Sequence, residues 1–227
     1  MTVARRGRSE AGRAEVRRDL VAAAVTQFTE QGYDDTTVDD IAAAAGVGRR
    51  TFFRYFRAKE EAVSPDHAAA LARVDEIFES AHPTEPPAVL ALRAGETVFD
   101  IYTEDPALSV ARYRVTHQVP ALRDRESASV DHYRRLFTRH LRRRLSADPD
   151  GDLRAAVIGS AVVAAHNLAL RTWLTDGAPV AGIPAMVERY RAVAGMLPVE
   201  QPGLAEVADR LEAAVGRLEQ QPGAPRR

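Results

Sequence analysis

The sequence predicts an all-α fold, and three observations support this prediction. Apolar residues recur at i, i+3 and i+4 in nearly every segment, which is the spacing of one buried helix face. No convincing alternation of apolar and polar residues, the pattern of a half-buried strand, appears along the chain. Proline, glycine and aspartate cluster at a few points and divide the 227 residues into a series of helical segments.

The N-terminal part divides into a basic arm and three helices. Residues 1–14 contain several arginines and no apolar periodicity, so we expect a flexible arm. The next segment, residues 15–63, begins with a helix that ends near Gly32, a residue suited to the left-handed conformation after a helix. The second and third helices are expected over residues 37–46 and 49–56.

The remaining residues predict a longer series of helices, bounded by prolines and glycines. In chain order these cover residues 58–78 (with a kink or a restart at Pro65), 89–102, 106–119, 120–145, 153–174, 185–197 and 204–218. Residues 82–87 form the clearest linker, and Asp105 followed by Pro106 predicts a helix cap with proline at the first helical position. We expect one large domain over residues 64–200, followed by an extra helix and tail over 201–227.

Residues 37–56 predict a helix-turn-helix unit. Thr37 can cap the second helix, with Asp40 three residues later in a short version of the capping box. Gly46 suits the left-handed position that ends this helix, and Gly48 is acceptable as the N-cap of the next one. Two helices joined by such a short turn form a unit that many DNA-binding proteins use.

The third helix has an apolar back and a basic front when its residues are placed at about 100° per residue. Phe52 and Phe56 face the core, whereas Arg50 and Arg54 lie on the opposite side. The helix dipole disfavours Arg50 and its neighbour Arg49 in the first turn by roughly 0.3–1 kcal/mol each. Arg50 also repels Arg54 four residues later.

A polyanionic partner would turn both unfavourable interactions, with the helix dipole and between the arginines, into favourable ones. Arginine is also the side chain whose fork matches guanine O6 and N7 in the major groove. Thr51 can contact thymine or a phosphate, and Tyr55 and Lys59 suit phosphates at the edge of the groove. The alternative is a solvated basic face on an ordinary helical hairpin. Because the turn is complete and the arginines are poorly placed for a free helix, we favour a DNA-binding surface.

Composition and motifs argue against several other functions. The chain lacks cysteine, which excludes disulfides and thiolate metal sites and fits a reducing cytoplasm. Its N-terminus has no apolar segment typical of a secretory signal. The longest apolar run, residues 155–170, is shorter than the ~20 residues of a membrane span and contains His166 and Asn167. We therefore expect a cytoplasmic protein without a membrane association.

The sequence offers little for catalysis. It has no P-loop lysine motif, no G-x-S-x-G and no H-E-x-x-H, and its histidines show no metal-ligand spacing. The turn over residues 148–152 resembles a calcium loop, but its glycine is misplaced and Gly159 stands where the bidentate glutamate belongs. We expect no catalytic residues, no metal and no cofactor, and keep an enzyme acting on an acyl-type substrate as the weakest alternative.

A resemblance to a known family lies in the stretch TVDDIAAAAGVGRRTFFRYFRAKEEAV. It is similar to the DNA-binding head of the TetR family of bacterial repressors, over about residues 16–63. The resemblance implies that Thr37 and Tyr55 contact phosphate, that Lys59 lies against the DNA backbone and that the third helix reads bases. Gly48 replaces the usual serine or threonine cap and Phe53 replaces a frequent tyrosine, so two potential hydroxyl contacts are lost.

The expected DNA-binding residues are Thr37, Gly48, Arg49, Arg50, Thr51, Phe53, Arg54, Tyr55 and Lys59. Arg50 stands where a small residue is common in the family, and is expected to set an operator preference of its own. Because one head reads only a few base pairs, a symmetric dimer on a palindromic operator is expected. The family implies that the dimer forms a four-helix bundle from residues 153–174 and 185–197.

The larger half resembles, through DPALSVARYRVTHQVPALRDRE and ALRTWL, an actinobacterial subgroup described as binding acyl-CoA-like ligands. Candidate pocket residues are Phe78, Phe99, Tyr102, Arg112, Tyr113, His117, Phe137, His166, Asn167, Leu170 and Trp173. An aromatic residue at helical spacing belongs to the core more often than to a pocket. His166 and Asn167 interrupt an apolar helix, and burying each unpaired would cost roughly 1–3 kcal/mol. They either pair across a dimer interface or face a cavity.

The sequence therefore predicts a ligand-responsive transcriptional regulator. We expect a homodimeric repressor that a small lipophilic or acyl-CoA-like effector releases from double-stranded operator DNA. Two alternatives stay open, an activator and a DNA-binding protein without a small-molecule ligand.

Overall fold

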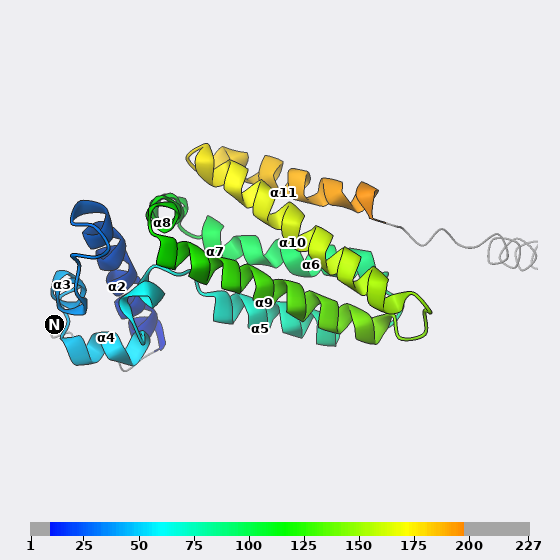
Figure 1. The fold of residues 1–227 in the computed structure, drawn as a ribbon, viewed down its shortest axis with the longest axis horizontal. Helices are drawn as coiled ribbons and strands as arrows, with labels where there is room; N and C mark the ends of the chain where they lie inside the picture. Colours follow the sequence, from blue (N-terminus) through cyan, green and yellow to red (C-terminus); the bar gives the residue numbers. More distant parts are fainter. Residues whose placement is uncertain (1–9, 198–227) are drawn as a thin grey trace, which may run out of the picture. The chain divides into compact units, whose positions relative to one another are not determined.

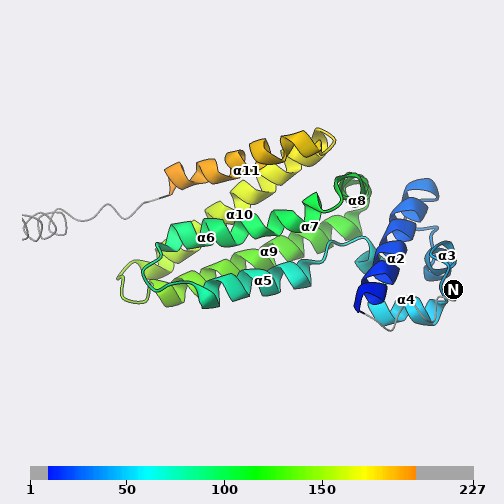
Figure 2. The ribbon, with the colours of Figure 1, turned by 180° about the vertical axis from the view of Figure 1, so that it is seen from behind.

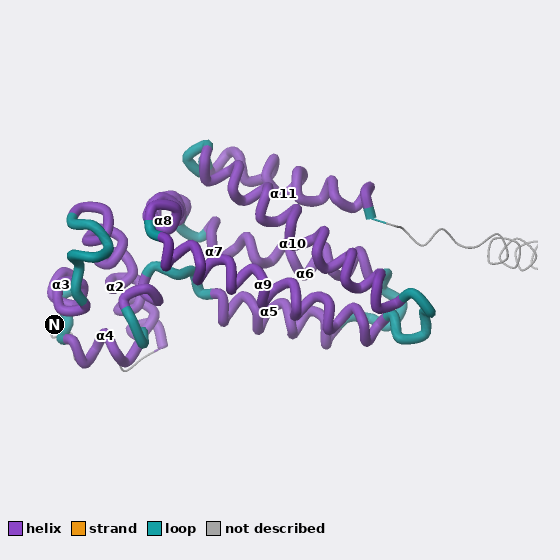
Figure 3. The backbone as a smooth tube through the Cα atoms, viewed as in Figure 1, coloured by secondary structure: helices purple, strands orange, loops and turns teal. Residues whose placement is uncertain are grey.

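The computed structural model describes residues 10–197, which contain helices and no strand (Figures 1 and 3). The helices are α2 (Glu10–Glu30), α3 (Val38–Ala44), α4 (Arg49–Tyr55), α5 (His67–Ser80), α6 (Pro87–Glu96), α7 (Asp100–Thr103), α8 (Pro106–Gln118), α9 (Pro120–Arg144), α10 (Gly151–Thr175) and α11 (Ile183–Arg191). Short 3-10 helices are η1 (Lys59–Ala62), η2 (Thr97–Phe99), η3 (Val180–Gly182) and η4 (Ala192–Met196). The all-α prediction is confirmed.

Some helix boundaries differ from the prediction. Helix α2 begins at Glu10, so residues 10–14 belong to a helix rather than to a flexible arm. The chain restarts after Pro65, because Asp66 accepts a hydrogen bond from the amide of Ala69 and caps a new helix. Residues 1–9 of the expected arm and the helix expected at 204–218 lie outside the described residues.

The helix expected over residues 89–102 is longer and interrupted. It begins at Pro87, which has the fixed backbone angle and the missing amide hydrogen that suit a first helical position. The 3-10 helix η2 then separates α6 from α7, at the point where the Thr97 hydroxyl donates to the carbonyl oxygen of Ala94 (2.8 Å). Such a hydroxyl bond to the preceding turn competes with regular α-helical pairing.

The head consists of α2, α3, α4 and η1 (Figure 1). These helices surround a small apolar core. Leu20, Ile41 and Phe52 are completely buried in this core. Two residues that follow much later in the chain, Val115 of α8 and Leu122 of α9, are buried in the same cluster. The core of the head is therefore completed by residues of α8 and α9. Residues up to 63 supply only part of it.

The larger body is built on the long helices α9 and α10, which pack against each other (Figure 2). Helices α5 and α6 pack with them, and α11 lies along α10. Tyr190 of α11 is completely buried, and its hydroxyl donates to the carbonyl oxygen of Leu92 on α6 (2.8 Å). Gly95 permits this approach, because a Cβ at that position would collide with the Tyr190 hydroxyl.

Among the described helices, α10 is long and apolar enough to cross a membrane by length and composition alone. Of its most apolar 18-residue window 44% is buried, and α6, α9 and α11 all pack against the helix. This packing agrees with the interpretation of α10 as a core helix of the larger body.

Candidate DNA-binding surface and effector cleft

The turn between α3 and α4 has the geometry that the sequence predicts. The Thr37 hydroxyl accepts from the amide of Asp40 (3.2 Å), and the Asp40 carboxylate accepts from both the hydroxyl (2.6 Å) and the amide (2.8 Å) of Thr37. These hydrogen bonds lower the pKa of Asp40. Gly46 has φ of 67°, and the amide of Val47 donates to the carbonyl oxygen of Ala42 (2.9 Å). The helix thus ends in a Schellman motif.

Helix α4 presents its basic face to solvent. Phe52 and Phe56 are buried, as predicted, whereas Arg50 and Arg54 are exposed. The Arg54 guanidinium lies over the ring of Tyr55, 5.1 Å from its centroid. Arg50 makes no hydrogen bond or ion pair with any residue that the structure describes, so its guanidinium is available to an external partner.

Arg49 differs from Arg50, although both lie in the first turn of α4. Its guanidinium pairs with the Asp39 carboxylate of α3 (2.9 Å) and lies 5.2 Å from the ring centroid of Phe53. This ion pair offsets the unfavourable interaction with the helix dipole that the sequence predicts for Arg49. Phe53 is 44% exposed, and together with Arg49 it forms one edge of the basic face.

Lys59 is placed differently from the sequence-based expectation. Its ammonium group donates to the carbonyl oxygens of Tyr33 (2.6 Å) and Thr36 (2.9 Å) and lies 4.2 Å from the Tyr33 ring centroid. The Tyr33 hydroxyl donates to Glu60 (2.7 Å), and burial followed by this hydrogen bond raises the pKa of Tyr33. Lys59 therefore holds the loop between α2 and α3, and its contact with a DNA phosphate stays a prediction.

A cleft of about 260 Å³ lies in the larger body next to the head. It is lined by Pro65, Tyr102, Ser109, Arg112, Tyr113, Thr116, His117, Arg123, Glu126, Ser127, Val130, Asn167, Leu170, Arg171 and Leu174, which come mainly from α8, α9 and α10. Six of these are among the pocket residues predicted from the sequence, namely Tyr102, Arg112, Tyr113, His117, Asn167 and Leu170.

A smaller cavity of about 20 Å³ adjoins the cleft and shares Tyr102, Glu126, Val130 and Asn167 with it. His166 and Phe137, also predicted pocket residues, line this smaller cavity. The His166 ring stacks on Phe99 at a centroid distance of 4.1 Å, and its Nε2 atom is buried without a hydrogen-bond partner. Burial is the largest cause that lowers the pKa of His166, to about 4. His166 therefore lines a cavity within one subunit, and its role in binding a ligand stays a prediction.

Three predicted pocket residues line neither cavity. Phe78 stacks on His140 at a centroid distance of 4.7 Å. Phe99 is buried between His166 and Tyr190. The Trp173 indole N–H donates to the carbonyl oxygen of Pro179 (3.0 Å), which directs the ring toward the α10–α11 turn. These aromatic residues belong to the core, which is the ordinary role of an aromatic at helical spacing.

Sequence reasoning missed several polar residues at the cleft and at the smaller cavity. His67 lies 3.3 Å from the Glu126 carboxylate and 3.2 Å from the Tyr133 hydroxyl, although these partners are 59 and 66 residues away in the chain. No local pattern could have revealed these pairs. Arg171 carries a local signal, because it follows Asn167 by one helical turn and must therefore lie on the same side of α10.

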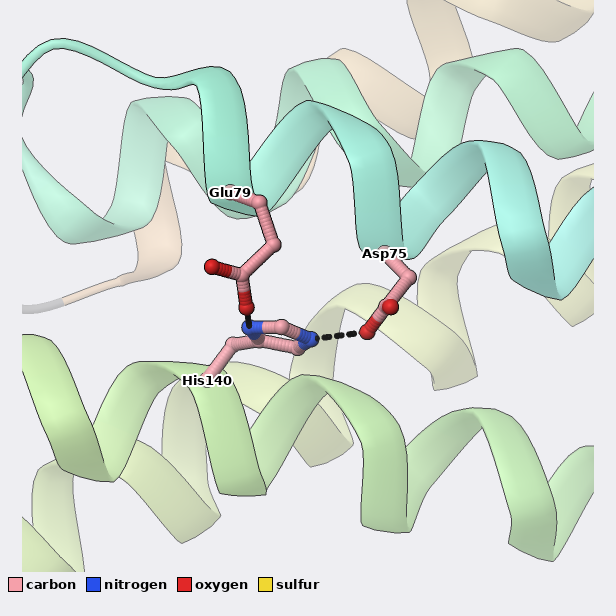
Figure 4. Close-up of side chains that lie close together, drawn as sticks. All are labelled: Asp75, Glu79 and His140. Atoms are coloured by element: carbon pink, nitrogen blue, oxygen red, sulfur yellow. Dashed lines mark hydrogen bonds and ion pairs between the residues drawn. The ribbon is translucent and has the colours of Figure 1, made fainter.

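Asp75, Glu79 and His140 lie close together between α5 and α9 and resemble a metal-binding group in composition (Figure 4). The two carboxylates flank different ring nitrogens of His140, with Asp75 2.6 Å from Nε2 and Glu79 3.7 Å from Nδ1. One imidazole nitrogen binds one ion, so these carboxylates do not converge on a single site. Asp75 also pairs with Arg139 and Glu79 with Arg143, which makes the cluster a charge network that joins α5 to α9.

Comparison with known proteins matches two parts of the chain to described families. Residues 20–63 match the family described as bacterial regulatory proteins, tetR family. Residues 86–198 match the family described as the MftR C-terminal domain. The first match contains α3, the turn and α4, and the second contains the helices that line most of the cleft.

Two curated proteins are similar over most of their length. The HTH-type transcriptional regulator TcmR of Streptomyces glaucescens is 30% identical over 168 residues, which cover 69% of this chain and 72% of TcmR. MftR of Mycobacterium tuberculosis, named for regulation of mycofactocin biosynthesis, is 28% identical over 154 residues, which cover 67% of this chain and 77% of MftR.

Solved structures share the fold at low sequence identity. A TetR-family regulator from Syntrophomonas wolfei has a TM-score of 0.62 at 17% identity and covers 85% of this chain and 99% of its own. FadR from Bacillus subtilis, in complex with stearoyl-CoA, has a TM-score of 0.52 at 19% identity, and the match covers 76% of this chain and 96% of FadR. The helix-turn-helix geometry, the two family matches and the similarity to TcmR agree, and the chain belongs to the TetR family of bacterial transcriptional regulators, as a DNA-binding regulator and not an enzyme.

Proposed function

We propose that the protein is a homodimeric repressor that a small lipophilic or acyl-CoA-like effector releases from a palindromic operator. The exposed face of α4 would read bases, with Arg50 as its principal base-reading residue. Thr51, Arg54 and Tyr55 would flank it on the DNA. The protein would act in the cytoplasm, where it meets chromosomal DNA.

The observation that carries this proposal is that α8 contributes residues both to the wall of the cleft and to the core of the head. Its residues Arg112 and Tyr113 line the cleft, while Val115 is buried in the core of the head. A ligand that shifts α8 would therefore act directly on the packing of α2. Release needs only that the effector binds one arrangement of α8 more tightly than the other, because a ligand shifts an equilibrium by its difference in affinity.

An exposed apolar stripe on α10 supports the proposal of a dimer. Leu153, Val157 and Leu168 are 66%, 45% and 54% exposed. At about 100° per residue they fall within an arc of about 60°, and the exposed Ala164 lies between them. Large apolar side chains aligned on one face are typical of a surface that another protein covers. A second copy would cover it in the four-helix arrangement that the family resemblance implies.

The class of effector is supported by the cleft and by two solved relatives of the fold. FadR from Bacillus subtilis was solved with stearoyl-CoA, and SmeT, with a TM-score of 0.53 at 17% identity, was solved with triclosan. The cleft of this chain combines apolar residues, including Val130, Leu170 and Leu174, with a few polar groups. That combination is typical of small-molecule sites.

Binding of the purified protein to its own promoter region tests the proposal. We expect a salt-sensitive preference for this DNA over random DNA of equal length, and a loss of that preference when decanoyl-CoA or decanoate is added. Transcription from the promoter in vitro then separates repressor from activator. Equal affinity for promoter and random DNA would contradict the proposal, and DNA binding that no acyl compound changes would contradict its effector part.

A further inference from the structure

Arg112 is an unusual residue in the effector cleft. It extends from α8, is half-buried, and lines the cleft wall. Its Nε atom is buried and has no hydrogen-bond partner, and no ion pair joins its guanidinium to any residue in the described part of the chain. A desolvated cation without a partner is costly, and buried charges in proteins are normally paired.

The charges around Arg112 do not compensate for this burial. After burial itself, the largest cause that lowers the Arg112 pKa is the like charge of Arg17 on α2. Three groups act in the opposite direction: the phenol of Tyr102, and the acids Asp105 and Asp66, which are both engaged elsewhere. Asp105 caps α8, and Asp66 caps α5 and pairs with Arg17 (3.2 Å). The fold therefore holds Arg112 without supplying a counter-ion.

The rest of the cleft is compatible with an anion and an apolar tail. Its lining contains three arginines and one acid, Glu126, which pairs with His67 (3.3 Å). Arg123 donates to the carbonyl oxygen of His117 (2.9 Å), and Arg171 is exposed at the rim. The cleft thus combines excess positive charge with an apolar wall.

The cleft is also small. Its volume of about 260 Å³ lies just below the range of roughly 300–1,000 Å³ that is typical of ligand pockets. A ligand of moderate size with one charge suits it better than a nucleotide with several phosphates. A carboxylate matches the geometry of a single guanidinium, because its two oxygens can accept two parallel hydrogen bonds from the two N–H groups.

We infer that the effector carries a carboxylate on a medium-length apolar skeleton, and that Arg112 binds this carboxylate. Arg112 is then the residue that determines specificity for an acid over a neutral compound of the same shape. The inference rests on the proposed effector function of the cleft and specifies the ligand class. It also explains why the unpaired charge is retained, since the partner arrives with the ligand.

Calorimetric titration of the full-length protein near neutral pH tests this inference. The probes are decanoate, 1-decanol and decanoyl-CoA, which share one apolar chain and differ in the head group. We expect decanoate to bind roughly 10–100-fold more tightly than 1-decanol, the factor that corresponds to a hydrogen bond with a charged group. Arg112→Gln should abolish the difference, and Arg112→Lys should retain part of it.

Arg114→Gln is the matched control, because Arg114 lies on the same helix, is exposed, and does not line the cleft. Its preference for decanoate should equal that of the unchanged protein. Arg112→Gln should also melt no lower than the unchanged protein, since it removes the repulsion with Arg17.

The possible outcomes separate the inference from the proposed function. Loss of the preference for decanoate in Arg112→Gln alone supports both. If decanoate and 1-decanol bind equally, or if Arg112→Gln keeps the preference, the inference is wrong while the effector cleft stands. Tight binding of decanoyl-CoA that Arg112→Gln does not change would also overturn the carboxylate assignment. If none of the probes binds, both proposals fail.

Discussion

Lys59→Met should lower the free energy of unfolding by about 3 kcal/mol. The ammonium group donates two hydrogen bonds to carbonyl oxygens, at 2.6 Å to Tyr33 and 2.9 Å to Thr36. Hydrogen bonds to charged groups contribute roughly 1.5–3 kcal/mol each, and the half-buried position of Lys59 places both near the lower limit. Methionine keeps the apolar part of the side chain, so the decrease in the free energy of unfolding comes mainly from the removed ammonium group.

Urea denaturation followed by circular dichroism measures this effect. Arg57→Met is the matched control, because Arg57 is exposed and its side chain makes no hydrogen bond or ion pair with other described residues, so the expected change is within about 0.5 kcal/mol. The lone lysine of the sequence thus has hydrogen bonds within the head that the side chain of Arg57 lacks.

The same variant separates this role from the one that the family resemblance implies. If Lys59 instead contacts a DNA phosphate, Lys59→Met should leave unfolding unchanged and lower the slope of log affinity against log salt by about 1. An unchanged free energy of unfolding together with that smaller slope would refute the structural role.

Three further predictions address base reading, assembly and acid sensitivity. Arg50→Ala should weaken the binding free energy on operator DNA by about 1–3 kcal/mol and reduce the sequence preference in competition assays. An equal loss of affinity on all DNA sequences would contradict base reading. Leu168→Asp should shift the protein from dimer to monomer in light scattering, because it places a charge in the apolar stripe of α10, and an unchanged mass would place the interface elsewhere. Burial lowers the pKa of His166 from 6.5 to about 4, so stability present above pH 6.5 should fall by about 3 kcal/mol as the pH drops to 4. In urea titrations at each pH, His166→Phe should not show this loss of stability between pH 6.5 and 4. The same pH profile in the variant and in the unchanged protein would disprove the prediction.

The head was predictable from sequence because its signals are local. The capping box at Thr37, the left-handed Gly46 and the burial of Phe52 depend on residues within one or two helical turns, and each is confirmed. The compensation of Arg49 by Asp39 was missed, because these residues are on different helices and meet only through the turn.

The cleft was predictable only in part. The two polar residues inside an apolar helix, His166 and Asn167, were predicted to face a cavity or a dimer interface because such groups are costly without a partner, and both line a cavity in the structure. Aromatic content was a poor guide, since Phe99 and Trp173 serve the core equally well. The pairing of His67 with Glu126 depends on how α5 packs against α9, which no spacing along the chain reveals.

The participation of α8 in the core of the head has a consequence for building chimeric regulators. A chimera could join the DNA-binding part of one protein to the sensing part of another directly after η1. In this chain that junction would separate the head from Val115 and Leu122, which are buried against it. A functional hybrid would need these two positions, and the surface of α2 that they cover, to come from the same parent. Recipient scaffolds should therefore be chosen for the residues on their equivalent of α8 before their sensing specificity is considered.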